Sequence, residues 1–177
     1  QESSHVHQAS ICPTTQEIYT SDLGTDTLNA YVFEKGYLKP KTKLDINVTK
    51  GGGPRHMVFK KNGKFAYVAN ELTGGVSILK LIDGKFHHIE TINSLPLNYQ
   101  GIPSSSAIRI HPNNKYLYVG NRKADTITIF KIHDEQLRLI GYTITGGKEL
   151  REFNIIPNGK WLIACHQDSH DTIVYLI

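Results

Sequence analysis

Cysteine, methionine and tryptophan are scarce in this sequence of 177 residues, with two, one and one copies respectively. Two cysteines are too few for a small fold held together by several disulfides. Cys12 and Cys165 fall inside predicted strands of different repeats, and we expect both to be buried free thiols. They form no metal-ligand pattern with their neighbours.

Long apolar runs are also missing. No stretch approaches the roughly 20 apolar residues that a membrane-spanning helix needs, and the first residues lack the charged-then-apolar pattern of a signal peptide. We therefore expect no membrane partner. The net charge of +4 is mild and the lysines are scattered, which argues against nucleic-acid binding but suits attraction of a small anion.

What the sequence does contain is a repeat with a period of about 48 residues, a period in the range typical of β-propellers. Four stretches align: HVHQASICPTTQEIYTSD (5–22), RHMVFKKNGKFAYVAN (55–70), AIRIHPNNKYLYVGN (107–121) and EFNIIPNGKWLIACH (152–166). Each reads as strand, tight turn, strand, and a β-branched run follows. Helical periodicity is absent. The predicted fold class is all-β, a β-propeller of four-stranded antiparallel blades.

The repeats define the expected domain organisation. We expect a single partial propeller domain over residues 1–177, with blade-like repeats at about 5–53, 54–105, 106–150 and, incomplete, 151–177. In the second repeat the predicted strands are 55–60, 65–70, 76–81 and 86–92. About three and two-thirds blades are then present, which predicts part of a larger ring. The cut would leave two apolar blade faces bare and favour self-association.

A propeller aims equivalent positions of every blade at one central channel. The start of the first strand and the end of the second lie on the same rim of that channel. The equivalent starts are His7, Arg55, Ser106 and Arg151. The second strands end at Asp22, Asn70, Asn121 and His166, followed by Leu23, Glu71, Arg122 and Gln167. These positions are polar and differ between blades, whereas the strand interiors are apolar, which favours a binding site at this rim.

Counting residues outward from each turn centre predicts the hairpin register. The expected opposite pairs are His7 with Leu23, Arg55 with Glu71, Ser106 with Arg122 and Arg151 with Gln167. A β-bulge would shift any of these pairs by one residue.

The residue types at the rim suit chemistry on an anionic ligand that carries a carbonyl group. Arginine offers paired donors to phosphate or carboxylate, and arginine or amide groups can stabilise an oxyanion. Glutamate or histidine can relay a proton. His5 and His7 point the same way and could bind a metal with His166 or His170, but no carboxylate or cysteine spacing supports this, and we expect no metal.

The string GGGPRHMVFKKNGKFAYVANEL (51–72) resembles the hallmark of lactonase-type seven-bladed propellers, the bacterial 6-phosphogluconolactonase family, whose relatives include a fungal carboxy-muconate lactonizing enzyme. HVHQASICP (5–13), SDLGTD (21–26), SSAIRIHPNNKYLYVGNR (105–122) and REFNIIPNGKWLIA (151–164) also match. The resemblance covers essentially the whole chain and implies a seven-bladed ring of roughly twice this length.

The resemblance also implies hydrolysis of 6-phosphoglucono-δ-lactone to 6-phosphogluconate, in the pentose phosphate pathway, in the cytoplasm and without a cofactor. Carried over by motif, the catalytic groups are His7, Arg55, Glu71 and Arg122. Our candidate substrate-binding residues are His5, Asn70, Asn121 and Arg151. The sequence does not decide whether His7 or Glu71 is the base.

Three alternatives remain open at this stage. One is a lactonizing isomerase that acts on a carboxylated muconate with the same groups. Another is a non-catalytic scaffold that binds proteins on a propeller face. The last is an inactive fragment whose cut faces pair with another copy.

Overall fold

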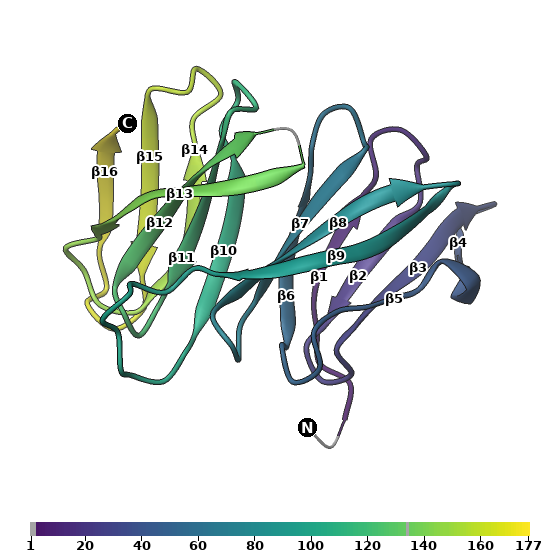
Figure 1. The fold of residues 1–177 in the computed structure, drawn as a ribbon, viewed down its shortest axis with the longest axis horizontal. Helices are drawn as coiled ribbons and strands as arrows, with labels where there is room; N and C mark the ends of the chain where they lie inside the picture. The colour runs from purple at the N-terminus through teal and green to yellow at the C-terminus, as the bar shows by residue number, and fades with distance from the viewer. Residues whose placement is uncertain (1–2, 134) are drawn as a thin grey trace.

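The computed structural model describes residues 3–133 and 135–177, which form four separate antiparallel sheets (Figure 1). The first contains β1 (Val6–Ile11), β2 (Ile18–Asp22), β3 (Thr27–Glu34), β4 (Tyr37–Pro40) and β5 (Ile46–Asn47). The second contains β6 (Pro54–Phe59), β7 (Phe65–Asn70), β8 (Gly75–Ile82) and β9 (Lys85–Asn93). The third contains β10 (Ser105–Ile110), β11 (Tyr116–Asn121), β12 (Thr126–His133) and β13 (Gln136–Ile144), and the fourth β14 (Leu150–Ile155), β15 (Trp161–His166) and β16 (Thr172–Leu176).

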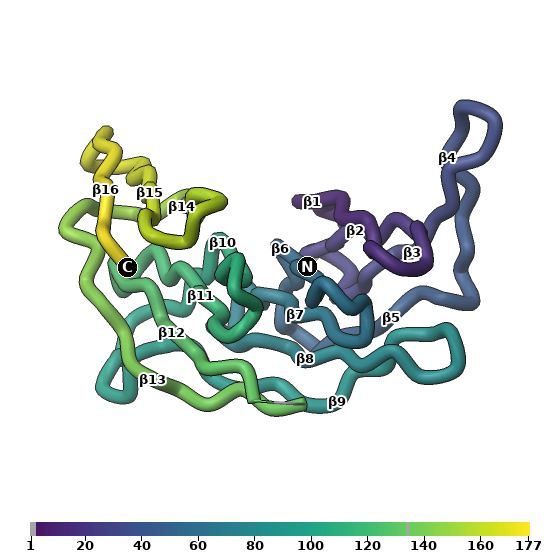
Figure 2. The backbone as a smooth tube through the Cα atoms, turned by 90° about the horizontal axis from the view of Figure 1, so that it is seen from above, coloured from purple at the N-terminus to yellow at the C-terminus, as the bar shows by residue number. Residues whose placement is uncertain are grey.

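The sheets are the blades of a partial propeller. Seen from above, they follow one another along an open arc, with β1, β6, β10 and β14 toward its concave side and β9 and β13 on its convex side (Figure 2). The predicted all-β class, the antiparallel blades and the incomplete last blade are confirmed, and the arrangement matches part of a seven-bladed ring. Among the described residues no helix has the length and hydrophobicity of a membrane span.

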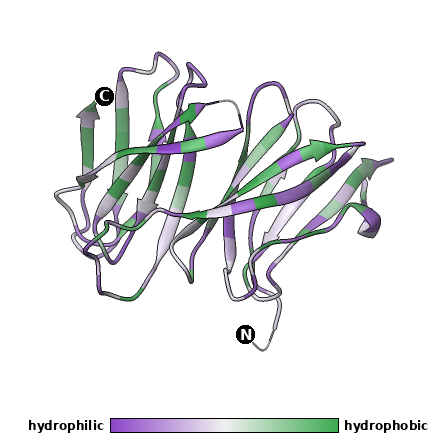
Figure 3. Ribbon diagram, viewed as in Figure 1, coloured by the Kyte–Doolittle hydropathy of each residue, from purple (hydrophilic) through white to green (hydrophobic). Residues whose placement is uncertain are grey.

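Apolar side chains of facing sheets pack between the blades. Each of the three blade-to-blade junctions has its own cluster, centred for example on Tyr19 and Phe86, on Tyr67 and Phe130, and on Phe153. Figure 3 shows hydrophobic residues concentrated in the strands and hydrophilic ones at many of the connecting turns. The three clusters hold the inner strands at fixed spacing, and the inner strands carry the candidate site.

The fourth strand of the first blade departs from the predicted pattern. It is split into β4 and β5 by the 3₁₀ helix η1 (Thr42–Leu44), and the tip of the β3–β4 hairpin extends away from the arc (Figure 2). Cys12 lies just after β1 and is buried, and Cys165 lies on β15 and is exposed. Both are free thiols as predicted, but the expectation that Cys165 is buried was wrong because it lies on the uncovered face of the last blade.

The predicted hairpin registers were wrong in all four blades, for one shared reason. The second hairpin pairs Phe59 with Ala66 around the four-residue turn 61–64, so its centre falls half a residue earlier than Gly63. Each inner strand then carries a bulge, and the breaks lie at Val6/Gln8, Pro54/His56, Ser105/Ile108 and Leu150/Glu152. The backbone partner of Glu71 is consequently Gly53, at 2.8 Å, and not Arg55.

The bulges coincide with the predicted site positions. His7, Arg55 and Arg151 are the extra residues in their strands, and Ser106 lies within the corresponding break of the third blade. A bulge bends its strand and redirects the side chain of the extra residue. An irregularity in the inner strand therefore recurs at equivalent points of all four blades, at the mouth of the channel.

The face of the last blade that no other described blade covers exposes an apolar surface. On β15 and β16, Trp161 pairs with Leu176 and Ile163 with Val174, and Trp161, Val174 and Leu176 are 42%, 56% and 71% exposed. We expect this surface to drive concentration-dependent self-association, and a V174K variant to weaken it at least about tenfold because a buried, unpaired charge is costly. Sedimentation velocity over a dilution series measures this. A monodisperse monomer at all concentrations would contradict the expectation.

Candidate active site

The centre of the site is a carboxylate held by two arginines from different blades. Glu71, just after β7, lies with Oε2 2.8 Å from Nε of Arg55 and with Oε1 2.5 Å from Nη2 of Arg122. The contact between Arg55 and Glu71 is an ion pair and not a hydrogen bond, because the N–H of Nε does not point at Oε2. Arg55 is 4% exposed and Arg122 is 9% exposed. Both carboxylate oxygens are thus paired, each with the guanidinium group of a different arginine.

Arg55 is held at a further point. Its Nη1 donates to the backbone carbonyl of Ser106, 3.2 Å away in the next blade, and lies 2.8 Å from Nε2 of His56. Burial lowers the pKa of Arg55, while the charge of Glu71 raises it. A guanidinium keeps its proton at any physiological pH, so Arg55 is a fixed cation at the blade interface.

Gly53 is required where the chain turns into the inner strand. Its φ of +64° is in the left-handed region, and a Cβ there would lie 2.7 Å from Cγ of Leu72. Asp26 accepts the backbone N–H groups of Gly51 at 2.7 Å and of Gly53 at 2.9 Å. Both amides therefore donate to Asp26 and are not available to a phosphate. The glycine-rich loop forms the turn into the channel.

His7 stands beside the arginines as a neutral imidazole. Desolvation, followed by the positive charges of Arg55, Arg151 and Arg122, lowers the pKa of His7 below its ordinary value of 6.5, with Glu71 acting in the opposite direction. His7 is an exposed residue on the bulge of β1. Its ring is thus reachable by a ligand and able to accept a proton at neutral pH.

Arg151 lies within electrostatic range of the same groups. It is exposed at the bulge of β14, and its charge contributes to lowering the pKa values of both His7 and Arg55. Three arginines against one glutamate make this rim electropositive. His7, Arg55, Glu71, Arg122 and Arg151 are therefore brought together, as the repeat alignment predicts.

Three predicted substrate-binding residues are placed elsewhere. Asn70 and Asn121 are fully buried, and their amides donate to Ser77 and Thr128 of their own blades at 2.8 and 3.1 Å. They tie second strands to third strands and have no surface to offer a ligand. His5 is exposed, and its ring lies 3.3 Å from Oγ of Ser3 and makes no contact with the arginines among the described residues.

The sequence interpretation overlooked a second layer of charge below the rim. His56, 12% exposed at its side chain, lies between Arg55 and Glu152, with Nδ1 3.9 Å from Oε2 of Glu152. The other oxygen of Glu152 lies 2.8 Å from Nη2 of Arg109. The string Pro54-Arg55-His56 contained the signal, because a bulge at Arg55 directs consecutive residues toward the same cluster.

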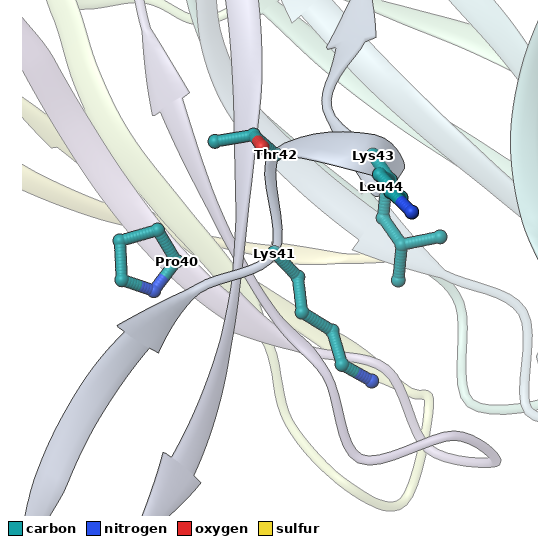
Figure 4. A pocket seen from close by; sticks show the side chains of 5 residues that line it. All are labelled: Pro40, Lys41, Thr42, Lys43 and Leu44. Carbon is teal, nitrogen blue, oxygen red and sulfur yellow. The ribbon is translucent and has the colours of Figure 1, made fainter.

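Two further features of the described residues concern metal binding and a hollow at η1, away from the rim cluster. Within residues 3–133 and 135–177 no group of three or more His, Cys, Asp or Glu side chains could hold a metal ion. A hollow of about 460 Å³ surrounds η1 and is lined by Pro40 to Leu44 (Figure 4). Its Lys41 pairs with Glu17 at 3.2 Å, and its lining shares no residue with the rim cluster.

Comparison with known proteins gives one family over the whole chain. The sequence profile described as "Lactonase, 7-bladed beta-propeller" matches residues 1–177. Among curated proteins, an uncharacterized protein of Staphylococcus saprophyticus is 36% identical over 170 residues, covering 95% of this chain and 49% of its own. One from Lactococcus lactis is 36% identical over 181 residues, covering 99% of this chain and 52% of its own.

Solved structures agree with this. A candidate 6-phosphogluconolactonase from Bacteroides fragilis superimposes with a TM-score of 0.89 at 34% identity, covering 98% of this chain and 51% of that one. The periplasmic gluconolactonase PpgL of Pseudomonas aeruginosa gives a TM-score of 0.90 at 28% identity, covering 98% and 50%. The chain therefore spans about half the length of the relatives and structures that it matches.

Proposed function

The chain belongs to the lactonase family of seven-bladed β-propellers, and from this premise we propose that its rim cluster serves hydrolysis of a phosphorylated sugar lactone, 6-phosphoglucono-δ-lactone, to 6-phosphogluconate. The observation that carries the proposal is the clamp of Glu71 between Arg55 and Arg122, beside a neutral and accessible His7. Two arginines held by one carboxylate can stabilise an oxyanion, and a neutral histidine beside them can accept a proton from water. This combination suits acyl transfer to water.

In the proposed mechanism His7 is the general base. Both oxygens of Glu71 are already paired with arginines, so Glu71 is better suited to hold Arg55 and Arg122 than to take a proton. The neutral imidazole accepts a proton from water as the water oxygen bonds to C1 of the lactone. The imidazolium then returns that proton to the ring oxygen as the C1–O bond breaks, and the open-chain acid is released.

The arginines stabilise the charges in this reaction. Arg55 is buried and fixed by Glu71 and by the carbonyl of Ser106, so we assign to it the oxyanion that develops on the C1 carbonyl oxygen. Arg122 and Arg151 then remain for the phosphate, where guanidinium groups provide paired donors. No metal or organic cofactor has a role in this scheme.

A panel of substrates tests the proposal. We expect the purified chain to hydrolyse 6-phosphoglucono-δ-lactone with a lower KM than unphosphorylated glucono-δ-lactone, measured by acid release in a pH-stat. Preferred turnover of a carboxylated muconolactone would favour a lactonizing isomerase, which needs the same groups. Absence of turnover on every lactone would favour a scaffold, or a need for the rest of the ring. The predicted cytoplasmic location stays a prediction, and one structural neighbour is periplasmic by its description.

The pH dependence follows from the lowered pKa of His7. A general base works in its neutral form, so kcat/KM should fall as the pH drops through a value below 6.5. Arg151 lowers that pKa, and removing its charge in an R151Q variant should move the acid limb to higher pH. R138Q on the outer strand β13 removes the same charge away from the site and serves as the control. An acid limb that does not move in R151Q would contradict the assignment of His7.

A further inference from the structure

His56 is a buried histidine below the rim that the proposed reaction does not use. It follows Arg55 on β6, and its side chain is 12% exposed. Its Nε2 lies 2.8 Å from Nη1 of Arg55. A guanidinium nitrogen can only donate, so Nε2 of His56 must be the acceptor. In a neutral imidazole the ring proton is then on Nδ1.

The electrostatic surroundings agree with this tautomer. Desolvation by burial, then the charges of Arg55 and Arg109, and smaller contributions from His7 and Arg151, lower the pKa of His56 to about 3. The imidazole is therefore neutral throughout the physiological range. A protonated ring would present N–H groups on both sides and could not accept from Arg55.

The Nδ1 side of the ring points toward an acceptor held in place by a third blade. Oε2 of Glu152 lies 3.9 Å from Nδ1, beyond hydrogen-bond distance, and Nδ1 is buried without another partner among the described residues. Glu152 is fixed through Oε1 by Arg109 at 2.8 Å. Arg109, Glu152, His56 and Arg55 thus follow one another in space, and only the step from Glu152 to His56 lacks a hydrogen bond.

From these contacts we propose that His56 is a positioning residue for Arg55, which it holds in the orientation that offers a free donor to the reacting anion. The inference rests on the proposed function. Nε of Arg55 faces Glu71, and Nη1 is shared between His56 and the carbonyl of Ser106. Among the described residues Nη2 of Arg55 has no partner. His56 thus fixes the guanidinium plane so that Nη2 is the donor left for an oxyanion or phosphate.

Two variants of similar size separate positioning from packing. In H56Q the side-chain amide oxygen can still accept from Nη1 of Arg55, whereas H56L fills the space without an acceptor. We expect H56L to weaken binding of 6-phosphogluconate, used as the probe, about tenfold or more, because an Arg55 that can rotate no longer holds its hydrogen bond to the anion, and a hydrogen bond between charged groups is worth about that much. H56Q should stay within about threefold of the wild-type chain. Far-UV circular dichroism checks that both variants are folded.

Nitrogen-15 NMR of the full chain tests, without any substrate, whether His56 fixes the guanidinium group of Arg55. The inference predicts a neutral Nδ1–H tautomer for His56 from pH 5 to 8, and separate Nη1 and Nη2 signals for an Arg55 that cannot rotate. These separate signals should persist in H56Q and merge in H56L. An Nε2–H or protonated His56, or unchanged Arg55 signals in H56L, would overturn the inference. If the NMR results hold but no probe binds to the wild-type chain, the proposed function fails and the positioning role stands.

Discussion

Replacing His7 with glutamine should lower kcat for lactone hydrolysis by about 10²- to 10⁴-fold, the usual contribution of a general base. Desolvation and the surrounding arginines hold the pKa of His7 below 6.5, and His7 is exposed on the bulge of β1, where a ligand can reach it. Glutamine keeps a polar side chain there but cannot take a proton from water. Initial rates at saturating lactone measure the loss, and KM should change little because the arginines remain.

The matched control is H87Q, which makes the same exchange at an exposed position of the outer strand β9. It should retain the wild-type rate. If H7Q kept more than a tenth of the wild-type kcat, the base would have to be another group, and Glu71 would be the next candidate despite its two arginine partners.

The largest effect on stability is expected at Asn121. Its Oδ1 accepts from Oγ of Ser94 and Ser105 at 3.1 and 2.9 Å, and its Nδ2 donates to the carbonyl of Ser94 and to Oγ1 of Thr128 at 2.9 and 3.1 Å. All of these groups are fully buried. An N121L variant would leave several of them unpaired, and we expect the free energy of unfolding to fall by about 3 kcal/mol or more.

Urea unfolding followed by circular dichroism measures this change. N154A on β14, where the asparagine is exposed, should alter stability by less than about 0.5 kcal/mol. Asn70 provides an internal comparison, since its Nδ2 has Ser77 as a partner whereas its buried Oδ1 has none. We expect N70L to cost less than N121L. Equal and small effects at all three positions would contradict the structural role assigned to Asn121.

The period of the sequence predicted the fold well because each repeat carries the same turn and strand pattern. Predicted strands 55–60, 65–70, 76–81 and 86–92 correspond to β6 to β9, and no strand end differs by more than one residue. The split of the fourth strand into β4 and β5 was not foreseen. Asp45 accepts the backbone N–H of Ala30 at 2.8 Å, and a side-chain contact of this kind gives no periodic signal.

The site was predicted for a reason that the structure corrects. Opposite positions in a hairpin were expected to bring Arg55 to Glu71, but the bulge shifts the register and Glu71 faces Gly53. The two side chains meet because the bulge redirects Arg55 toward the channel mouth. Alignment of equivalent positions was therefore a better guide than register, since bulges recur at the same point in each blade.

The asparagines show the limit of that alignment. Asn70 and Asn121 end their second strands at the same point as Asp22, whose carboxylate accepts the backbone N–H groups of His5 and Gly24. A short polar side chain at this position closes the blade by hydrogen bonds to its own neighbourhood. Sequence alone does not separate a buried polar link from a ligand-binding group, because both require the same residue types.

An NMR titration of the wild-type chain with 6-phosphogluconate is the most direct test that one anion site lies at this rim. We expect the imidazole signals of His7 and the guanidinium signals of Arg55 and Arg122 to shift together with one common Kd, while His87 and Arg138 on the outer strands do not respond. Shifts at those outer residues with none at the rim, or rim residues that respond with unrelated affinities, would contradict it.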